Sequence, residues 1–119
     1  MNATILVVED DGLIRMDLAD TLTDQGFKVL EAGNADEAFE IMEQNALIHA
    51  LITDIDMPGS MNGLELARHV AEIRPDCAIT VISGRYSPSQ GALPAKARFL
   101  SKPVSEEAVA QTLAELGVG

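Results

Sequence analysis

Short apolar runs recur along the chain, and each run is bounded by polar or turn-forming residues. Runs this short are typical of strands that are buried in a sheet, because a helix needs a longer repeat to cover one face. The runs span residues 5–8, 29–30, 51–52, 78–82 and 99–100. They predict five short strands spread along the length of the chain.

Between these runs, apolar residues repeat at intervals of three or four positions. This is the spacing of one face of an α-helix, so each stripe predicts a helix that packs against the sheet. The four stripes are Ile14, Leu18 and Leu22; Ala35, Ala38, Phe39 and Met42; Leu66, Val70 and Ile73; and Val109, Leu113 and Leu116.

Three of these helices have a recognisable start. A polar cap followed three positions later by a glutamate has the spacing of a capping box, and acids in the first turn suit the positive end of a helix. The signals are Asn34 with Glu37, Asn62 with Glu65, and Ser105 followed by Glu106 and Glu107.

Strand and helix therefore alternate from one end of the chain to the other. This order predicts an α/β fold in which a five-stranded parallel sheet carries helices on both faces, joined by right-handed crossovers. No internal repeat, linker or low-complexity tract interrupts the pattern, so residues 1–119 are predicted to form one domain. In folds of this kind, ligands bind beyond the carboxyl ends of the strands.

Composition is ordinary for a soluble globular protein, with 47% hydrophobic and 23% charged residues in a chain of 119. The formal net charge of −11 repels nucleic-acid phosphates and anionic membranes, so we expect neither as a direct partner. No apolar run approaches the roughly 18 residues of a membrane span, and no signal-peptide pattern opens the chain. We therefore expect a cytoplasmic protein.

The cysteine and the histidines do not suggest a metal or redox site. Cys77 is the one cysteine, and we interpret it as a small apolar core residue. His69 falls in a predicted helix and His49 precedes the third strand. We interpret His69 as a solvated side chain and His49 as an edge residue.

Acidic side chains follow two of the predicted strands. Glu9, Asp10 and Asp11 come after the first strand, and Asp54 and Asp56 come at the end of the third. Because the carboxyl ends of parallel strands meet at one edge of the sheet, these carboxylates should converge there. Clustered carboxylates raise one another's pKa or bind a cation, and hard oxygens suit Mg²⁺ or Mn²⁺ rather than zinc.

Two further polar groups reach the same edge. Ser83 follows the fourth strand and Lys102 follows the fifth. A Mg²⁺ ion with open positions usually meets a phosphoryl group, whose oxygens a lysine and a serine hydroxyl can bind. A carboxylate then remains as the group that can attack phosphorus and form an acyl phosphate. The alternative is that these acids merely cap strands and helices in water.

Four stretches, in this order and spacing, resemble the receiver (CheY-like) domain of two-component response regulators. They are ILVVEDD at 5–11, ITDIDMPG at 52–59, ISG at 82–84 and FLSKP at 99–103. The resemblance extends from Thr4 to Leu116. It implies a flavodoxin-like strand order of 2-1-3-4-5 in the sheet.

The resemblance also implies a role for each acid. Asp54, at the end of the third strand, would be the phosphoacceptor and a Mg²⁺ ligand. Asp10 would bind Mg²⁺ directly, and Glu9 would act through metal-bound water. The backbone carbonyl of Asp56 would be a further ligand.

The remaining matched residues would handle the phosphoryl group. Ser83 and Lys102 would bind its oxygens, and Phe99 would be the switch residue whose rotamer follows the state of Ser83. We predict a cis peptide bond between Lys102 and Pro103, because X-Pro bonds adopt cis at low cost and a cis turn would aim the ammonium across the strand ends.

By the same resemblance, the phosphoryl donor would be a sensor histidine kinase or a histidine phosphotransfer protein. Phosphorylation would control the binding of a downstream protein target. The domain would not be an enzyme, beyond promoting its own phosphorylation and dephosphorylation. Met1 and the complete helix pattern favour a stand-alone receiver over a piece of a larger regulator.

The chain departs from the family pattern in three places. The side chain of Asp56 adds a carboxylate beside the phosphoryl site, where it would repel small anionic donors or position the hydrolytic water. The loop at 58–63 is one residue longer than the common form. The third departure is the segment 85–97, which precedes the fifth strand.

Segment 85–97 is a poor helix. Ser87 and Pro88 supply a cap and a first-turn proline, but Gly91 and Pro94 oppose propagation. We predict that the family's fourth helix is short or absent here, that the segment is mobile, and that the partner surface differs from the standard receiver face. The alternative is a rigid irregular loop.

Three other functions remain open at this stage. A phosphatase of the haloacid dehalogenase type also attacks phosphorus with an aspartate, but Pro58 stands where its motif needs Thr or Val after the acid pair. A flavodoxin needs a phosphate-binding loop after the first strand, where the acids at 9–11 would repel phosphate. A degenerate receiver would be an interaction module that is never phosphorylated, although the acids, hydroxyl and lysine are all present here.

Overall fold

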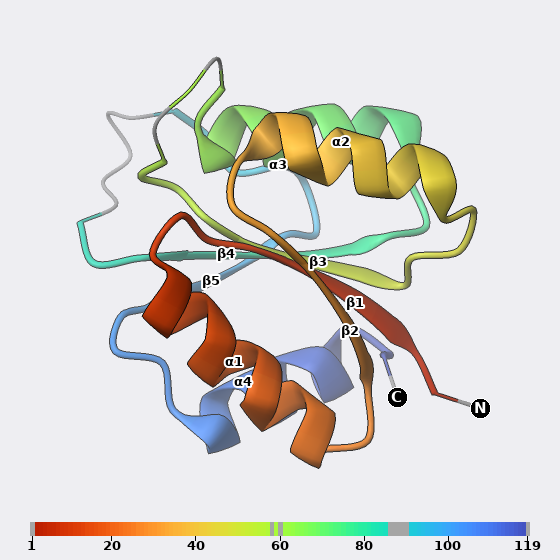
Figure 1. The fold of residues 1–119 in the computed structure, drawn as a ribbon. Helices are drawn as coiled ribbons and strands as arrows, with labels where there is room; N and C mark the ends of the chain where they lie inside the picture. Colours follow the sequence, from red (N-terminus) through yellow and green to blue (C-terminus); the bar gives the residue numbers. More distant parts are fainter. Residues whose placement is uncertain (1, 58, 60, 86–90, 119) are drawn as a thin grey trace.

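A computed structural model describes residues 2–57, 59, 61–85 and 91–118 of the chain. Within this part, five strands and four helices follow one another (Figure 1). The strands are β1 (Thr4–Val8), β2 (Lys28–Ala32), β3 (Ala50–Asp54), β4 (Ala78–Ser83) and β5 (Arg98–Ser101); the helices are α1 (Gly12–Asp24), α2 (Ala35–Gln44), α3 (Gly63–Ile73) and α4 (Glu106–Glu115). Among the described residues, none of the helices has the length and apolar character that a membrane crossing requires.

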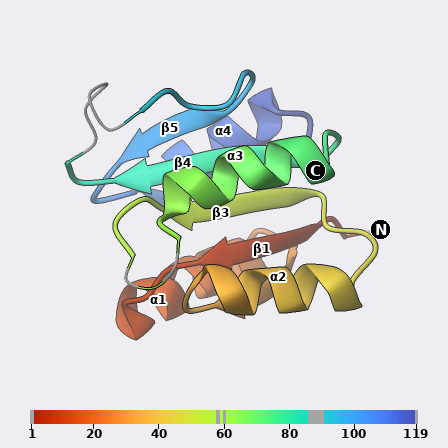
Figure 2. The same cartoon turned by 90° about the horizontal axis from the view of Figure 1, so that it is seen from above.

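The strands form one parallel sheet in the order β2-β1-β3-β4-β5, which confirms the predicted fold class and strand order. Figures 1 and 2 show α2 and α3 on one face of the sheet and α1 and α4 on the other. Strand β3 lies in the middle, between β1 and β4, and all five of its residues are buried. A polar side chain at the end of β3 therefore lies close to the protein interior.

Alternate residues of the central strands feed two separate cores. Leu6 and Leu51 belong to the core beneath α2 and α3, whereas Ile5 and Ile52 belong to the core against α1 and α4. The division follows from strand geometry, because successive side chains point to opposite faces of a sheet. Each fully buried side chain of this kind contributes about 1.5–3 kcal/mol, so the two cores together fix the register of the strands.

The capping signals at α2 and α3 differ in detail. Asn62 and Glu65 form a complete capping box, in which each side chain accepts a hydrogen bond from the other residue's backbone N–H. At α2, Asn34 accepts from the N–H of Glu37 at 2.9 Å, but the Glu37 carboxylate accepts from the N–H of Gly33 rather than from that of the cap.

The other two helices are capped by oxygen side chains. Ser105 accepts from the N–H of Ala108 at the start of α4, as the sequence predicts. Helix α1 starts at a cap that the pattern did not predict, Asp11, whose Oδ1 accepts from the N–H groups of Leu13 and Ile14. Capping occupies the Asp11 carboxylate, which explains how this acid is used at the start of α1.

An arginine from α3's C-cap holds the C-terminal end of α2. The guanidinium of Arg74 donates to the carbonyl oxygen of Met42 at 2.6 Å and to those of Asn45 and Ala46 at 3.3 Å each. The carbonyls of Met42 and Asn45 lie at the helix end, where acceptors have no intrahelical partners, and that of Ala46 lies just beyond it. Arg74 thereby ties the end of α3 to the end of α2.

The cysteine and the histidines contact their surroundings in different ways. Cys77 is buried, and burial raises the pKa of its thiol to about 11. His49 accepts a hydrogen bond through Nδ1 from the backbone N–H of Thr4 at 2.9 Å. His69 is exposed, as predicted, but its ring also packs edge-on against Phe39, with ring centroids 5.4 Å apart.

The connection from β4 to β5 has no helix in the parts that the structure describes, residues 84–85 and 91–97. This agrees with the prediction that the family's fourth helix is short or absent, whereas the predicted helix start at Ser87 lies outside the described residues. The carbonyl of Ala92 accepts a hydrogen bond from Nε of Arg68 on α3 at 3.2 Å. The mobility of the segment and its distinct partner surface stay predictions.

Helix α3 approaches the end of β3 so closely that its first residue has to be glycine. A Cβ atom on Gly63 would overlap the backbone carbonyl oxygen of Asp54. The N–H of Gly63 also donates to the carbonyl of Ile55 at 2.9 Å, which ties the helix start to the residue after the strand. The backbone of Asp54 is therefore held against α3.

We predict that Gly63→Ala destabilises the fold by about 1–3 kcal/mol, because backbone atoms must move to admit the methyl group. Gly12→Ala is the matched control: Gly12 is also the first residue of a helix, but a Cβ there would meet only the tip of Arg15, at 3.7 Å. Urea denaturation of both variants measures the difference. Equal stability of the two would contradict the close approach of α3 to β3.

Candidate functional site

The polar residues that follow the strands meet at one edge of the sheet. Glu9 comes directly after β1, Asp54 ends β3, Ser83 ends β4 and Lys102 comes directly after β5. Because the strands are parallel, their carboxyl ends lie together, and the fold joins residues as far apart in sequence as Glu9 and Lys102, 93 positions. Of the five acids that the sequence predicted to converge, Glu9, Asp10 and Asp54 come together here with the ammonium of Lys102. The other two differ: Asp11 caps α1, and the Asp56 side chain contacts the Ser83 hydroxyl.

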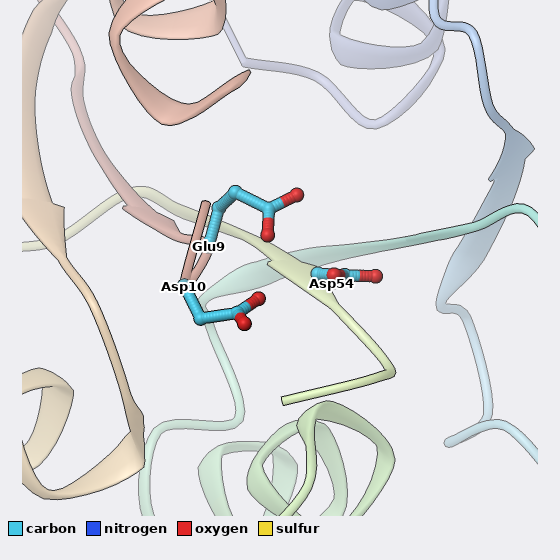
Figure 3. A group of neighbouring side chains, drawn as sticks. All are labelled: Glu9, Asp10 and Asp54. Carbon is cyan, nitrogen blue, oxygen red and sulfur yellow. The ribbon is translucent and has the colours of Figure 1, made fainter. Parts of the chain in front are cut away.

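Three carboxylates form the centre of this edge. Oxygens of Glu9, Asp10 and Asp54 all lie within 4.8 Å of one another, and Figure 3 shows the side chains of Glu9 and Asp10 turned towards Asp54. Glu9 is 1% exposed and Asp54 is 3% exposed, whereas Asp10 is open to solvent. Ionised carboxylates this close and this buried repel one another and lose hydration, so the group requires positive charge nearby.

Lys102 supplies part of that positive charge. Its ammonium lies 2.7 Å from Oε1 of Glu9 and 3.1 Å from Oδ2 of Asp54, so it bridges the two buried carboxylates. Burial lowers the pKa of Lys102, but hydrogen bonds and charges from Glu9 and Asp54 outweigh burial and raise this pKa above its ordinary value. Lys102 therefore stays protonated at neutral pH, and its stabilising effect is lost only as the pH rises through the raised pKa.

Arg15 of α1 holds the end of β1. Its Nη1 donates to the backbone carbonyl of Glu9 at 2.8 Å, and its Nε lies 3.3 Å from Oε1 of Glu31 at the end of β2. Oε2 of Glu9, the carboxylate oxygen that does not contact Lys102, accepts a hydrogen bond from the N–H of Asp11 at 3.1 Å. Sequence reasoning missed Arg15, and the one available signal was its place a helical turn after the Asp11 cap.

Asp10 is the exposed member of the carboxylate group. Its pKa is raised above the ordinary value of 3.8, first by partial burial of the carboxyl and then by the neighbouring Glu9, while Lys102 opposes the rise. A carboxyl with a raised pKa binds its proton more tightly in the folded protein than in the unfolded chain. The ionised carboxylate of Asp10 therefore destabilises the folded protein relative to the unfolded chain.

Ser83 ends β4, the strand next to β3, and its side chain is buried. Its Oγ accepts from the N–H of Arg85 at 3.0 Å and donates to Oδ2 of Asp56 at 3.4 Å. The N–H of Asp56 lies 3.4 Å from Oδ1 of Asp54. The Asp56 side chain is exposed and contacts the hydroxyl, a relation that the sequence pattern did not predict.

Phe99 and Pro103 lie on either side of Lys102 in sequence. Phe99 is half-buried on β5, opposite Val81 of β4, the strand that ends in Ser83. The peptide bond between Lys102 and Pro103 is cis, as predicted.

The arrangement has two chemical capabilities. Its clustered donor atoms are carboxylate oxygens, which suit a hard divalent cation such as Mg²⁺ or Mn²⁺. Three carboxyl groups share one neighbouring ammonium, so a bound divalent cation would add positive charge where acids outnumber bases. A carboxylate such as that of Asp54, held beside an ammonium, can also act as a nucleophile.

A family model and a similar curated protein both indicate the same protein family. The family model described as "Response regulator receiver domain" matches residues 5–114. The response regulator receiver protein CpdR of Brucella abortus (strain 2308) is 39% identical over 103 residues, which are 83% of this chain and 83% of CpdR. The sensor kinase CckA of the same organism is 37% identical over 120 residues, which are 97% of this chain but 12% of the kinase.

A solved structure extends the similarity to the fold. The response regulator protein TrrA of Thermotoga maritima, in complex with Mg²⁺ and BeF, superimposes with a TM-score of 0.85. The match covers 96% of this chain and 98% of the TrrA chain, with 25% sequence identity.

We predict that Lys102→Met destabilises the fold by roughly 2–3 kcal/mol, less than the ~3–5 kcal/mol of a fully buried ion pair because Lys102 is partly exposed. Methionine keeps most of the side-chain volume but leaves Glu9 and Asp54 without their shared ammonium. The matched control is Lys28→Met on β2, where the lysine is exposed. Urea denaturation at pH 7 in a chelator measures both variants, and equal losses would contradict a stabilising role for Lys102.

Proposed function

Because this chain belongs to the response regulator receiver family, we propose that it accepts a phosphoryl group in a two-component signalling system. In this proposal, residues 1–119 form one receiver domain and Asp54 is the phosphoacceptor. The donor is a phosphohistidine on a sensor histidine kinase or a histidine phosphotransfer protein. The domain acts in the cytoplasm, where such donors present their phosphohistidine.

The position of Asp54 carries this proposal. Asp54 is the last residue of the central strand and is 3% exposed. Its Oδ2 lies 3.1 Å from the ammonium of Lys102. Glu9 and Asp10 add two more carboxylates within 4.8 Å. Burial of ionised acids is unfavourable, so a cluster of this kind is better explained by chemistry than by packing.

The proposed reaction is a nucleophilic substitution at phosphorus. A carboxylate oxygen of Asp54 attacks the phosphoryl group, an O–P bond forms, and the N–P bond of the donor breaks. The donor imidazole keeps the bonding electron pair and takes up a proton from solvent. Lys102 and Ser83 bind the phosphoryl oxygens during the transfer, Lys102 through charge and Ser83 through its hydroxyl.

Reversal by water completes the cycle. Attack of water on the phosphorus of the acyl phosphate releases inorganic phosphate and restores the Asp54 carboxylate. In this proposal the domain promotes only its own phosphorylation and dephosphorylation, and it is not an enzyme for other substrates.

Asp10, Asp54 and the backbone carbonyl of Asp56 are the proposed direct ligands of Mg²⁺, or of Mn²⁺, and Glu9 would act through metal-bound water. When bound, the ion would supply positive charge for the clustered acids and the phosphoryl oxygens. The carboxylate oxygens of Glu9, Asp10 and Asp54, which all lie within 4.8 Å of one another, support the assignment. The complex of TrrA with Mg²⁺ and BeF is further support, from a relative with 25% identity.

The output of phosphorylation is proposed to pass through Ser83 and Phe99. When Ser83 binds the phosphoryl group, space opens beside β4 that the half-buried Phe99 ring on β5 can enter. The changed surface around Phe99 and residues 91–97 would then bind a downstream protein target. The absence of a helix at 91–97 distinguishes this surface from one that presents a helix at the same place.

We predict that Asp10→Asn weakens Mg²⁺ binding by about tenfold or more, which corresponds to the loss of ~1.4 kcal/mol of attraction between the ion and a carboxylate. In a chelator, the same variant should be more stable than the wild type at pH 7, because it lacks the ionised Asp10. The exposure of Asp10 limits this gain to about 0.5 kcal/mol. Calorimetric titration with Mg²⁺ and urea denaturation measure the two effects.

The stability gain of Asp10→Asn in a chelator should depend on pH. The gain should be full above the raised pKa of Asp10 and should disappear below the ordinary value of 3.8, where the wild-type carboxyl is protonated in both states. Asp20→Asn, on the exposed side of α1, is the control and should leave Mg²⁺ affinity unchanged. Unchanged Mg²⁺ affinity in Asp10→Asn would contradict the proposed ligand set.

We predict that incubation with Mg²⁺ and acetyl phosphate, or with a phosphorylated histidine kinase, adds one phosphoryl group to the protein. Intact mass spectrometry measures the gain, which Asp54→Asn should abolish and Asp20→Asn should keep. A wild-type protein that gains no phosphoryl group from either donor would point to a degenerate receiver. Continuous turnover of a generic phosphomonoester would point instead to a phosphatase.

A further inference from the structure

The hydroxyl of Ser83 has a single proton, and in this structure the Asp56 carboxylate lies within reach of it. A serine hydroxyl can donate one hydrogen bond and accept two. Ser83 Oγ accepts from the N–H of Arg85 at 3.0 Å, and its proton is directed to Oδ2 of Asp56 at 3.4 Å. An amide N–H on one side and a carboxylate on the other thus set the orientation of the hydroxyl.

A phosphoryl group on Asp54 would need the same proton. Phosphoryl oxygens only accept hydrogen bonds, so Ser83 can bind them only by donating. Because Ser83 cannot donate to two acceptors at full strength, the Asp56 carboxylate and the phosphoryl group compete for it. The competition follows from the 3.4 Å contact together with the role that the proposed function gives to Ser83.

We infer that the Asp56 side chain is a positioning residue that holds the Ser83 hydroxyl in the unphosphorylated orientation and so opposes phosphorylation. This inference rests on the proposed function and adds a specific opposing contact to it. It concerns the side chain of Asp56 alone, because the proposed metal ligand is its backbone carbonyl. The inference also assigns a function to the Asp56 carboxylate, which is one of the departures of this chain from the family pattern.

The geometry suits a contact that forms and breaks. At 3.4 Å it is longer than the roughly 2.7–2.8 Å of a strong hydroxyl hydrogen bond, so little free energy is needed to release it. The Asp56 side chain is exposed and can turn into solvent, whereas Ser83 is 1% exposed and is fixed at the end of β4. A phosphoryl dianion would repel the Asp56 carboxylate and favour the release.

The test measures binding of beryllium fluoride with Mg²⁺, a stable mimic of the phosphoryl group, together with the rate of phosphorylation by acetyl phosphate. Asp56→Ala should bind the mimic about fivefold more tightly than the wild type and should be phosphorylated faster by a similar factor, the size of one weak charged hydrogen bond. Asp56→Asn keeps an oxygen acceptor without the charge, so its affinity should lie between the two. No gain in Asp56→Ala, or a loss, would overturn the inference.

A double-mutant cycle separates this contact from simple charge repulsion. If Asp56 acts through Ser83, removing it in a Ser83→Ala background should change the affinity for beryllium fluoride by less than about twofold. If Asp56 only repels the incoming anion, the fivefold gain should persist in that background. Persistence of the full gain would therefore overturn the positioning role while leaving the proposed function intact.

A second measurement does not depend on phosphorylation. In the unmodified, chelated protein, the backbone N–H of Arg85 donates to Ser83 Oγ, so its hydrogen exchange reports whether the hydroxyl is held. Exchange should be faster in Asp56→Ala than in the wild type, and Asp56→Asn should partly restore protection. If the wild type binds no beryllium fluoride, the proposed function fails. Unchanged Arg85 exchange in Asp56→Ala overturns the contact itself.

Discussion

Two carboxylates buried side by side, those of Glu9 and Asp54, require a cation within hydrogen-bond distance. Lys102 meets this requirement from the far end of β5, 93 residues after Glu9 and 48 after Asp54. One ammonium can reach both acids only while β1, β3 and β5 keep their places in the sheet. The charge balance of the site and the order of the strands therefore depend on each other.

The acids of the site, at the ends of β1 and β3, are held by shorter contacts than the contact between the Ser83 hydroxyl and Asp56. On the acidic side, Arg15 binds the carbonyl of Glu9 at 2.8 Å, and the start of α3 at Gly63 presses against the backbone of Asp54. On the β4 side, Ser83 Oγ accepts from the N–H of Arg85 at 3.0 Å and lies 3.4 Å from the carboxylate of the exposed Asp56. The backbones of Glu9 and Asp54 are thus held in place, while the long contact between the Ser83 hydroxyl and Asp56 can be broken at low cost.

The sequence predicted the parts of this molecule that depend on local spacing. Apolar periodicity gave the strands and helices, and the parallel sheet then implied that Asp54, Ser83 and Lys102 would meet at one edge. The contacts of Arg15 and Arg74 could not be predicted, because each joins elements whose relative placement appears only after folding. For the same reason, the bridging of Lys102 to Glu9 as well as Asp54 was not foreseen.

Both outer strands of the sheet are short and carry charge. Strand β2 has five residues, including Lys28 and Glu31, and β5 has four and begins with Arg98. A further strand that joined either edge would have to remove water from these side chains and would gain only a few ladder hydrogen bonds. Short length and charge therefore disfavour the pairing of either outer strand with a strand of another molecule.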